Sequence, residues 1–166
     1  KSVDEAIAHT PGDVTLHEYR ALAFFALGRY ADAAGVLNPV LASGPGWGWD
    51  TMIEFYDGTP TYDGQVAKLE SYVKGTPKAA DARFVLGYHY LVQGFMEKSY
   101  EQFEEVVKLQ PNDSIARQLR DLAKSSLPDP ELPEGVEPTP APEAERPAPV
   151  PTEKLVGTWV SDRGDK

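Results

Sequence analysis

The side chains in this sequence that could do chemistry are few, and their spacing fits no metal site. The chain has three histidines, His9, His17 and His89, and no cysteine. Two metal ligands on one helix face stand three or four residues apart, and no pair of these histidines has that spacing. Without cysteine, neither disulfides nor thiolate chemistry is available. The sequence therefore predicts no metal site.

The residues next to His17 and His89 indicate a structural role for these histidines and not a catalytic one. His17 and Glu18 are neighbours in sequence, and adjacent residues of a helix do not face each other. His89 lies between Tyr88 and Tyr90, where a half-buried, hydrogen-bonded imidazole is expected. The sequence contains no nucleophile elbow, phosphate-binding loop or constellation of carboxylates. We therefore expect neither enzymatic activity nor a cofactor.

The charge of the chain narrows the class of partner. Its 166 residues carry a formal net charge of −10 at pH 7. So acidic a chain repels phosphate groups, which argues against nucleic acid and anionic membrane surfaces as partners. No run approaches the roughly 18 apolar residues that span a bilayer. We expect a soluble protein of the cytoplasm or the periplasm, with a basic or mainly apolar partner.

A sequence repeat predicts the helices on which any functional site must lie. Four prolines follow similar apolar residues at intervals of 34, 32 and 34 residues: Pro11, Pro45, Pro77 and Pro111. Midway between them lie Gly28, Pro60 and Gly94, which end helices or cannot continue them. A fixed period near 34 is typical of repeat proteins, and each unit is predicted as a helix, a tight turn, a second helix and a proline.

This pattern predicts an all-α repeat solenoid of about seven helices over residues 1–126. Its parts are a remnant helix at 1–9, repeats at 13–43, 46–75 and 80–109, and a capping helix at 113–126. In the capping helix Ile115, Leu119, Leu122 and Ala123 form one apolar stripe. The chain lacks an initiator methionine and begins inside a repeat, so we expect it to be a fragment of a larger, bacterial protein.

The units resemble the tetratricopeptide repeat, a stack of helix-turn-helix units of 34 residues. The best-matching segment is 18–34, and the corresponding first-helix residues of the later units are Trp49, Met52, Ile53 and Tyr56, then Arg83, Leu86, Gly87 and Tyr90. The second unit departs from the pattern. It is two residues short between Pro45 and Trp49, and Gln65 replaces the usual small residue.

The resemblance implies a binding surface. In this family, ligands lie on the concave face, along outward positions of the first helices. The corresponding residues here are Glu18, Leu22, Phe25, Asp50, Glu54, Asp57, Phe84, Tyr88 and Leu91. Their mixture of apolar and acidic side chains predicts a groove for a peptide with apolar and Lys/Arg residues, and argues against carboxylate-terminated chaperone tails. The alternative is that Phe25, Phe84 and Leu91 pack between helices.

Two further segments follow the repeats. Residues 127–152 hold nine prolines, six acids and no aromatic residue, which predicts a disordered acidic linker. Residues 153–166 contain Gly157 and Trp159 in a pattern that resembles the opening Gly-x-Trp strand of lipocalin-like barrels. This predicted strand is either the start of a truncated second domain or a segment that docks in a groove.

The predicted function is a scaffold or adaptor module for protein–protein interaction. If Tyr88 lines its groove, Tyr88→Ala should weaken ligand binding with little loss of helix content. The alternative is a structural spacer or dimerisation array within the larger protein, which pairs through the apolar N-terminal edge left by residues 1–9.

Overall fold

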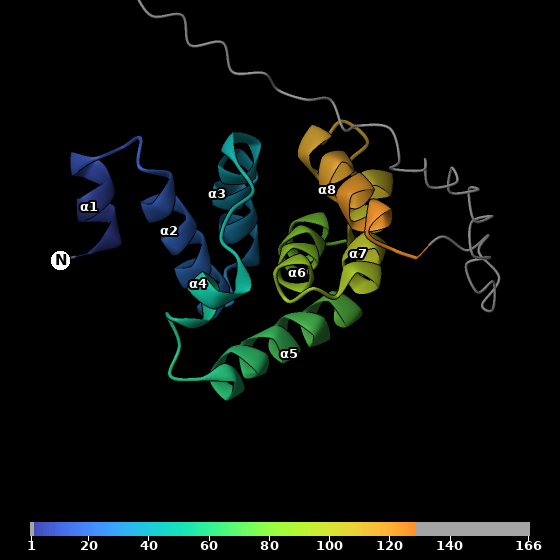
Figure 1. Ribbon diagram of the computed structural model, residues 1–166, viewed down its shortest axis with the longest axis horizontal. Helices are drawn as coiled ribbons and strands as arrows, with labels where there is room; N and C mark the ends of the chain where they lie inside the picture. The colour runs from blue at the N-terminus through green and yellow to red at the C-terminus, as the bar shows by residue number, and fades with distance from the viewer. Residues whose placement is uncertain (1, 129–166) are drawn as a thin grey trace, which may run out of the picture. The chain divides into compact units, whose positions relative to one another are not determined.

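The computed structural model describes residues 2–128, and the elements of this part are helices arranged as a repeat (Figure 1). They are α1 (Val3–His9), α2 (Val14–Ala26), α3 (Tyr30–Ser43), α4 (Trp49–Ile53), α5 (Thr59–Gly75), α6 (Ala80–Val92), α7 (Met96–Leu109) and α8 (Ser114–Ser125). The predicted all-α, tetratricopeptide-like fold is confirmed. None of the described helices has both the length and the apolar character needed to cross a membrane.

Nearly all of the predicted linker at 127–152, and the whole of the predicted strand at 153–166, lie outside the described residues. The helices number eight within the described residues, which matches the sum of the predicted parts (a remnant helix, three two-helix repeats and a capping helix) and is one more than the stated total of about seven.

The helix boundaries follow from local side chains. Asp13 begins α2 by accepting hydrogen bonds from the backbone N–H groups of Thr15 and Leu16. Asp113 begins α8 in the same way, and its carboxylate also accepts from Asn38 Nδ2 at 3.2 Å. Such caps satisfy N–H groups that the helix itself leaves unpaired. The cap at Asp113 therefore also ties α8 to α3.

Glycine makes the turns between paired helices, as the sequence predicts. Gly28 and Gly94 have φ angles of 72° and 80°, in the left-handed region that only glycine adopts readily. The turn of the second unit, between α4 and α5, differs from the prediction. Pro60 lies at the start of α5, and the residue with positive φ is Gly58, at 100°. Proline suits the first turn of a helix because its missing N–H would be unpaired there.

Two regular helix pairs form the body of the array. α2 packs against α3 and α6 against α7, with α8 added beyond α7. Gly87 of α6 lets the ring of Phe103 on α7 approach closely, and the Ser99 hydroxyl donates to the Gly87 carbonyl at 2.9 Å. In the capping helix, Leu119 and Ala123 are buried, but Leu122 is exposed, so the predicted apolar stripe is only partly covered.

The second unit departs from the repeat. Its first helix, α4, has only five residues, and Met52 is the one it buries. α3 therefore packs directly against α6 of the third unit, while α5 lies against α6 (Figure 1). The two missing residues and the glycines at 44, 46 and 48 account for the short helix, because glycine disfavours helix and the loop must still return to α5.

Candidate functional site

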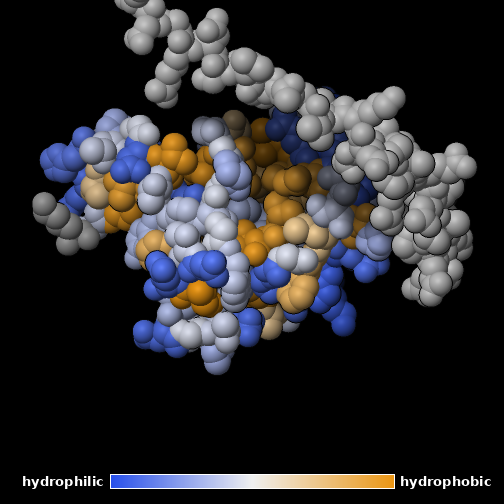
Figure 2. All heavy atoms as spheres, in the orientation of Figure 1, coloured by the Kyte–Doolittle hydropathy of each residue, from blue (hydrophilic) through white to orange (hydrophobic). Residues whose placement is uncertain are grey.

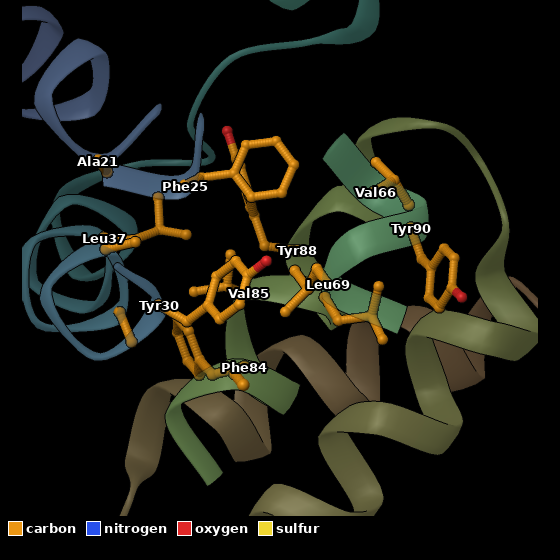
Figure 3. Packing of buried hydrophobic residues seen from close by; sticks show 14 of the residues in the cluster. Ala21, Phe25, Tyr30, Leu37, Val66, Leu69, Phe84, Val85, Tyr88 and Tyr90 are labelled. Carbon is orange, nitrogen blue, oxygen red and sulfur yellow. The ribbon is translucent and has the colours of Figure 1, made fainter. Parts of the chain in front are cut away.

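Most of the residues expected on an open concave face are not accessible. Five of the nine are buried: Glu18, Leu22, Phe25, Phe84 and Tyr88. Leu91 is half-buried, and the three acids of the second unit, Asp50, Glu54 and Asp57, are exposed. The picture of one continuous groove along these nine positions therefore needs correction. Phe25 and Phe84 follow the alternative, in which they pack between helices (Figure 3).

The second unit buries Phe25 and Glu18 because it covers part of α2 and α6, whereas the Phe84 ring packs against Phe103 of α7. Tyr62 of α5 is fully buried, with its ring 6.3 Å from that of Phe25 and 5.5 Å from the imidazole of His89. Figure 3 shows Phe25 of α2 and Tyr88 of α6 within the same cluster as Leu69 of α5. α5 thus occupies the part of the expected ligand surface that surrounds Phe25.

Glu18 is a buried carboxylate that holds the loop before α4. Its Oε1 accepts hydrogen bonds from the backbone N–H of Trp47 and from the Tyr88 hydroxyl, each 2.6 Å away. The loop comes so close that a Cβ on Gly46 would lie 2.9 Å from the same oxygen. Glu18 therefore connects the first unit, the loop and the third unit, and its role is structural.

His89 is buried more deeply than the sequence suggested, since only 2% of it is exposed. Gln93 Nε2 donates to the Tyr62 hydroxyl oxygen at 3.3 Å, so the hydroxyl hydrogen is available for His89 Nδ1 at 2.9 Å. This arrangement assigns the ring proton to Nε2. Burial lowers the pKa of His89 from 6.5 to about 3, because a charged imidazole at this buried position would lack hydration by water. It is a neutral core histidine.

An open groove lies between α2 and the start of α5. We call it the α2–α5 groove; its volume is about 290 Å³ and its lining residues are Tyr19, Leu22, Ala23, Ala26, Phe55, Tyr56, Asp57, Thr61 and Gln65. Leu22 and Asp57 are the two residues of the predicted site that it contains. The groove therefore overlaps the expected surface but is displaced from it around α2.

The groove exists because α4 is too short to cover α2. Tyr19, Ala23 and Ala26 recur at intervals of four and three residues, so they share one face of α2. α4 ends at Ile53, after which the chain turns away through Gly58 to begin α5. The two alanines on α2 project only methyl groups into the space that remains.

A row of aromatic rings forms the rim of the groove. The rings of Tyr19 and Phe55 lie 5.3 Å apart, and Phe55 stacks on Trp47 at 4.7 Å. Tyr19 and Phe55 are 42% and 46% exposed. The Trp47 backbone is held by Glu18, so the buried carboxylate also positions one end of the row. Figure 2 shows hydrophobic side chains reaching the surface around α4, next to hydrophilic ones.

The polar groups of the groove are acidic or neutral. Its lining residues include the carboxylate of Asp57 and no Lys, Arg or His. The Tyr56 hydroxyl donates to Gln65 Oε1 at 2.8 Å, and burial raises the pKa of Tyr56 to about 12, so it stays protonated. The surface can therefore accept a cation or an apolar group, and it would repel an anion.

Sequence reasoning missed Tyr19, Ala23 and Phe55 as site residues. The signal for them is the two-residue deletion before α4, because it leaves a helix of only five residues, which is too short to cover its neighbour. A second hollow, of about 390 Å³, lies between the start of α2 and α3 beside Val14 and Val36. Its lining has no carboxylate and no aromatic ring apart from His17. Within residues 2–128 no three His, Asp or Glu side chains come together to hold a metal ion.

Comparison with known proteins supports the repeat at the start of the chain. Residues 1–46, which include α1, α2 and α3, match the tetratricopeptide repeat family. No curated protein matches the chain, and no solved structure does. The match ends just before α4, where the second unit departs from the regular repeat.

Proposed function

We propose that this chain is a protein-interaction module that binds a peptide segment of its partner in the α2–α5 groove. Tetratricopeptide repeats generally mediate protein–protein interactions. The observation that carries the proposal is the aromatic row at the rim of this groove, in which Tyr19 and Phe55 are exposed and the half-buried Trp47 stacks on Phe55. Tyr, Trp and Phe are enriched in the centres of protein interfaces.

Charge supports an apolar or basic segment as the ligand. Asp57 lines the groove, the exposed Glu54 directly precedes Phe55 in the chain, and the chain carries a net charge of −10. Complementary charge speeds encounter and excludes acidic competitors, while the aromatic rim supplies apolar contact area. Of the three acidic residues expected to bind a partner in the second unit, Asp57 keeps that role at this groove.

Selection of ligands by the full chain tests the proposal. The immobilised chain is used to select from a phage-displayed random peptide library, and the selected peptides are titrated against Phe55→Ser and Phe95→Ser. Phe55 and Phe95 are matched, at 46% and 49% exposed, but Phe95 lies in the α6–α7 turn outside the groove. Loss of a central aromatic contact of about 2 kcal/mol would weaken binding roughly 30-fold.

We expect this loss for Phe55→Ser. For Phe95→Ser we expect less than about a two-fold change, which is the size of effect seen at positions that contribute almost nothing to binding. Recovery of no binding peptide, or equal losses in both variants, would contradict the proposed groove.

The rival function, a spacer or dimerisation array, draws on one observation. α1 buries none of its residues, although Val3, Ala6 and Ile7 are partly covered. If the N-terminal edge pairs two copies, light scattering would give a dimer mass that Ile7→Glu returns to the monomer. A monomer mass for the unmodified chain would favour the groove function.

A further inference from the structure

We propose that the α2–α5 groove selects an arginine side chain of its partner, with the guanidinium against the Tyr19–Phe55 rings and paired with Asp57. This inference rests on the proposed function and names the chemistry that the groove recognises. The volume of the groove limits the size of the group that it can bind. Its volume of about 290 Å³ lies at the lower end of ligand pockets, which is suited to one long side chain and the backbone that carries it.

The rim offers ring faces that no cation of the array uses. Within residues 2–128, four cation–ring contacts occur, and they involve the rings of Phe24, Tyr90 and Phe95. Tyr19, Phe55 and Trp47 take part in none of them, although two are more than two-fifths exposed. A cation placed within about 6 Å of such a ring is attracted by its electron-rich face.

The protein already uses this interaction one residue beyond the groove. On the adjacent face of α2, the Arg29 guanidinium lies 4.4 Å above the ring of Phe24, and that of Arg20 lies 5.3 Å from the same ring. Lys98 keeps its ammonium 5.3 Å from the two rings it approaches, which is also the Arg20 distance, so the Arg29 guanidinium alone makes the closer contact. The guanidinium is planar and weakly hydrated, so it stacks more closely than an ammonium does.

The same groove supplies a carboxylate that can pair with the cation. Asp57 lines the groove together with Phe55, two residues before it in the chain. A guanidinium can give two parallel N–H bonds to one carboxylate while its flat face remains on a ring, which a lysine cannot do. The hydroxyl of Thr61 and the side chain of Gln65 line the same space and can accept further N–H groups.

The expected selectivity is modest because the pair is exposed. Asp57 is solvent-exposed, so its ion pair with arginine is screened. An exposed ion pair and an exposed cation–π contact each change affinity by a few-fold. We therefore expect replacement of the arginine by lysine to weaken a bound peptide about three- to ten-fold. Replacement by citrulline, which is neutral and of the same shape, should weaken it by at least as much.

The test uses the full chain and the selected phage peptides described above. We expect arginine to be enriched at one position among them. The strongest peptide is then synthesised with arginine, lysine or citrulline at that position, and each form is titrated by fluorescence polarisation. The protein variants are Asp57→Asn, Phe55→Leu and a control, Asp81→Asn, which removes an exposed carboxylate on α6 away from the groove.

The inference predicts that the arginine preference falls to about two-fold or less in Asp57→Asn and in Phe55→Leu, and stays unchanged in Asp81→Asn. Peptides that lose binding with Phe55→Ser but tolerate lysine or citrulline would overturn the arginine inference and leave the proposed function standing. A preference that persists in both groove variants would also overturn it, because arginine would then be read elsewhere. Failure to select any peptide would overturn the proposed function itself.

Discussion

Acid should destabilise this array between pH 6.5 and 5 through a single buried imidazole. His89 is fully buried, and burial lowers its pKa from 6.5 to about 3. The unfolded chain exposes His89, which then binds a proton as the pH falls below 6.5. The folded protein does not bind this proton until the pH approaches 3. Because the unfolded state binds more protons in this window, stability is lost as the pH falls.

The size of the loss follows from the pKa of the unfolded state alone, as long as the folded value stays well below 5. From pH 6.5 to 5 the interval is 1.5 units, and each unit corresponds to about 1.36 kcal/mol, which gives about 2 kcal/mol. Carboxylates titrate mostly below this window, with ordinary pKa values of about 3.9 and 4.3. A domain has only about 5–15 kcal/mol of total stability, so the change is large enough to measure.

Urea unfolding at pH 7, 6 and 5, followed by circular dichroism, measures this change. The control is His89→Gln, in which a neutral amide can still meet the Tyr62 hydroxyl that now lies 2.9 Å from the imidazole. Between pH 7 and 5 the unmodified chain should lose about 2 kcal/mol more than the variant does. Parallel pH profiles for the two proteins would mean that His89 protonates in the folded state, and the reasoning from its burial would be refuted.

Two other perturbations test the packing between helices by the same urea assay. Tyr88→Phe removes the hydrogen bond to the Glu18 carboxylate and should cost about 1.5–3 kcal/mol, and Tyr88→Ala about 3–5 kcal/mol through the cavity as well. A Tyr88→Ala protein of unchanged stability would show that Tyr88 is not core. Replacing glycine by alanine inside a helix usually stabilises a protein by about 0.5–1 kcal/mol, and we expect this gain for Gly35→Ala because the space around Gly35 is open. Gly87→Ala places a Cβ 3.0 Å from the Phe103 ring, so the same gain should be cancelled or reversed there. Equal gains at both glycines would contradict the close approach of α6 and α7.

The repeat could be predicted from the sequence because its signals are local. Gly28 and Gly94 end helices by their own conformational freedom, and the recurring prolines mark the unit length. Asp13 and Asp113 cap helices through contacts two and three residues away. Features that depend on neighbours along the chain can be deduced from one sequence without knowledge of the tertiary packing.

The accessible surface could not be predicted in the same way because it depends on where the second unit lies. The family pattern places Phe25 and Tyr88 on an open face, and their apolar character is compatible with either a binding surface or a core. Tyr62 makes this region part of the core, because it fills the space between α2 and α6. Nothing in the sequence around Tyr62 indicates that contact. The deletion before Trp49 was visible, but its effect on α4 appears only when the helices are packed.

The same deletion limits what the groove can recognise. Tyr19 and Ala26 are seven residues apart on α2, so the uncovered face is roughly 10 Å long at a rise of about 1.5 Å per residue. An extended peptide, at about 3.3 Å per residue, places only about three residues along that length. So small a contact cannot offset the entropy of association with more than modest affinity. A tightly bound partner must therefore contact more of this molecule than the groove, or engage it at several places at once.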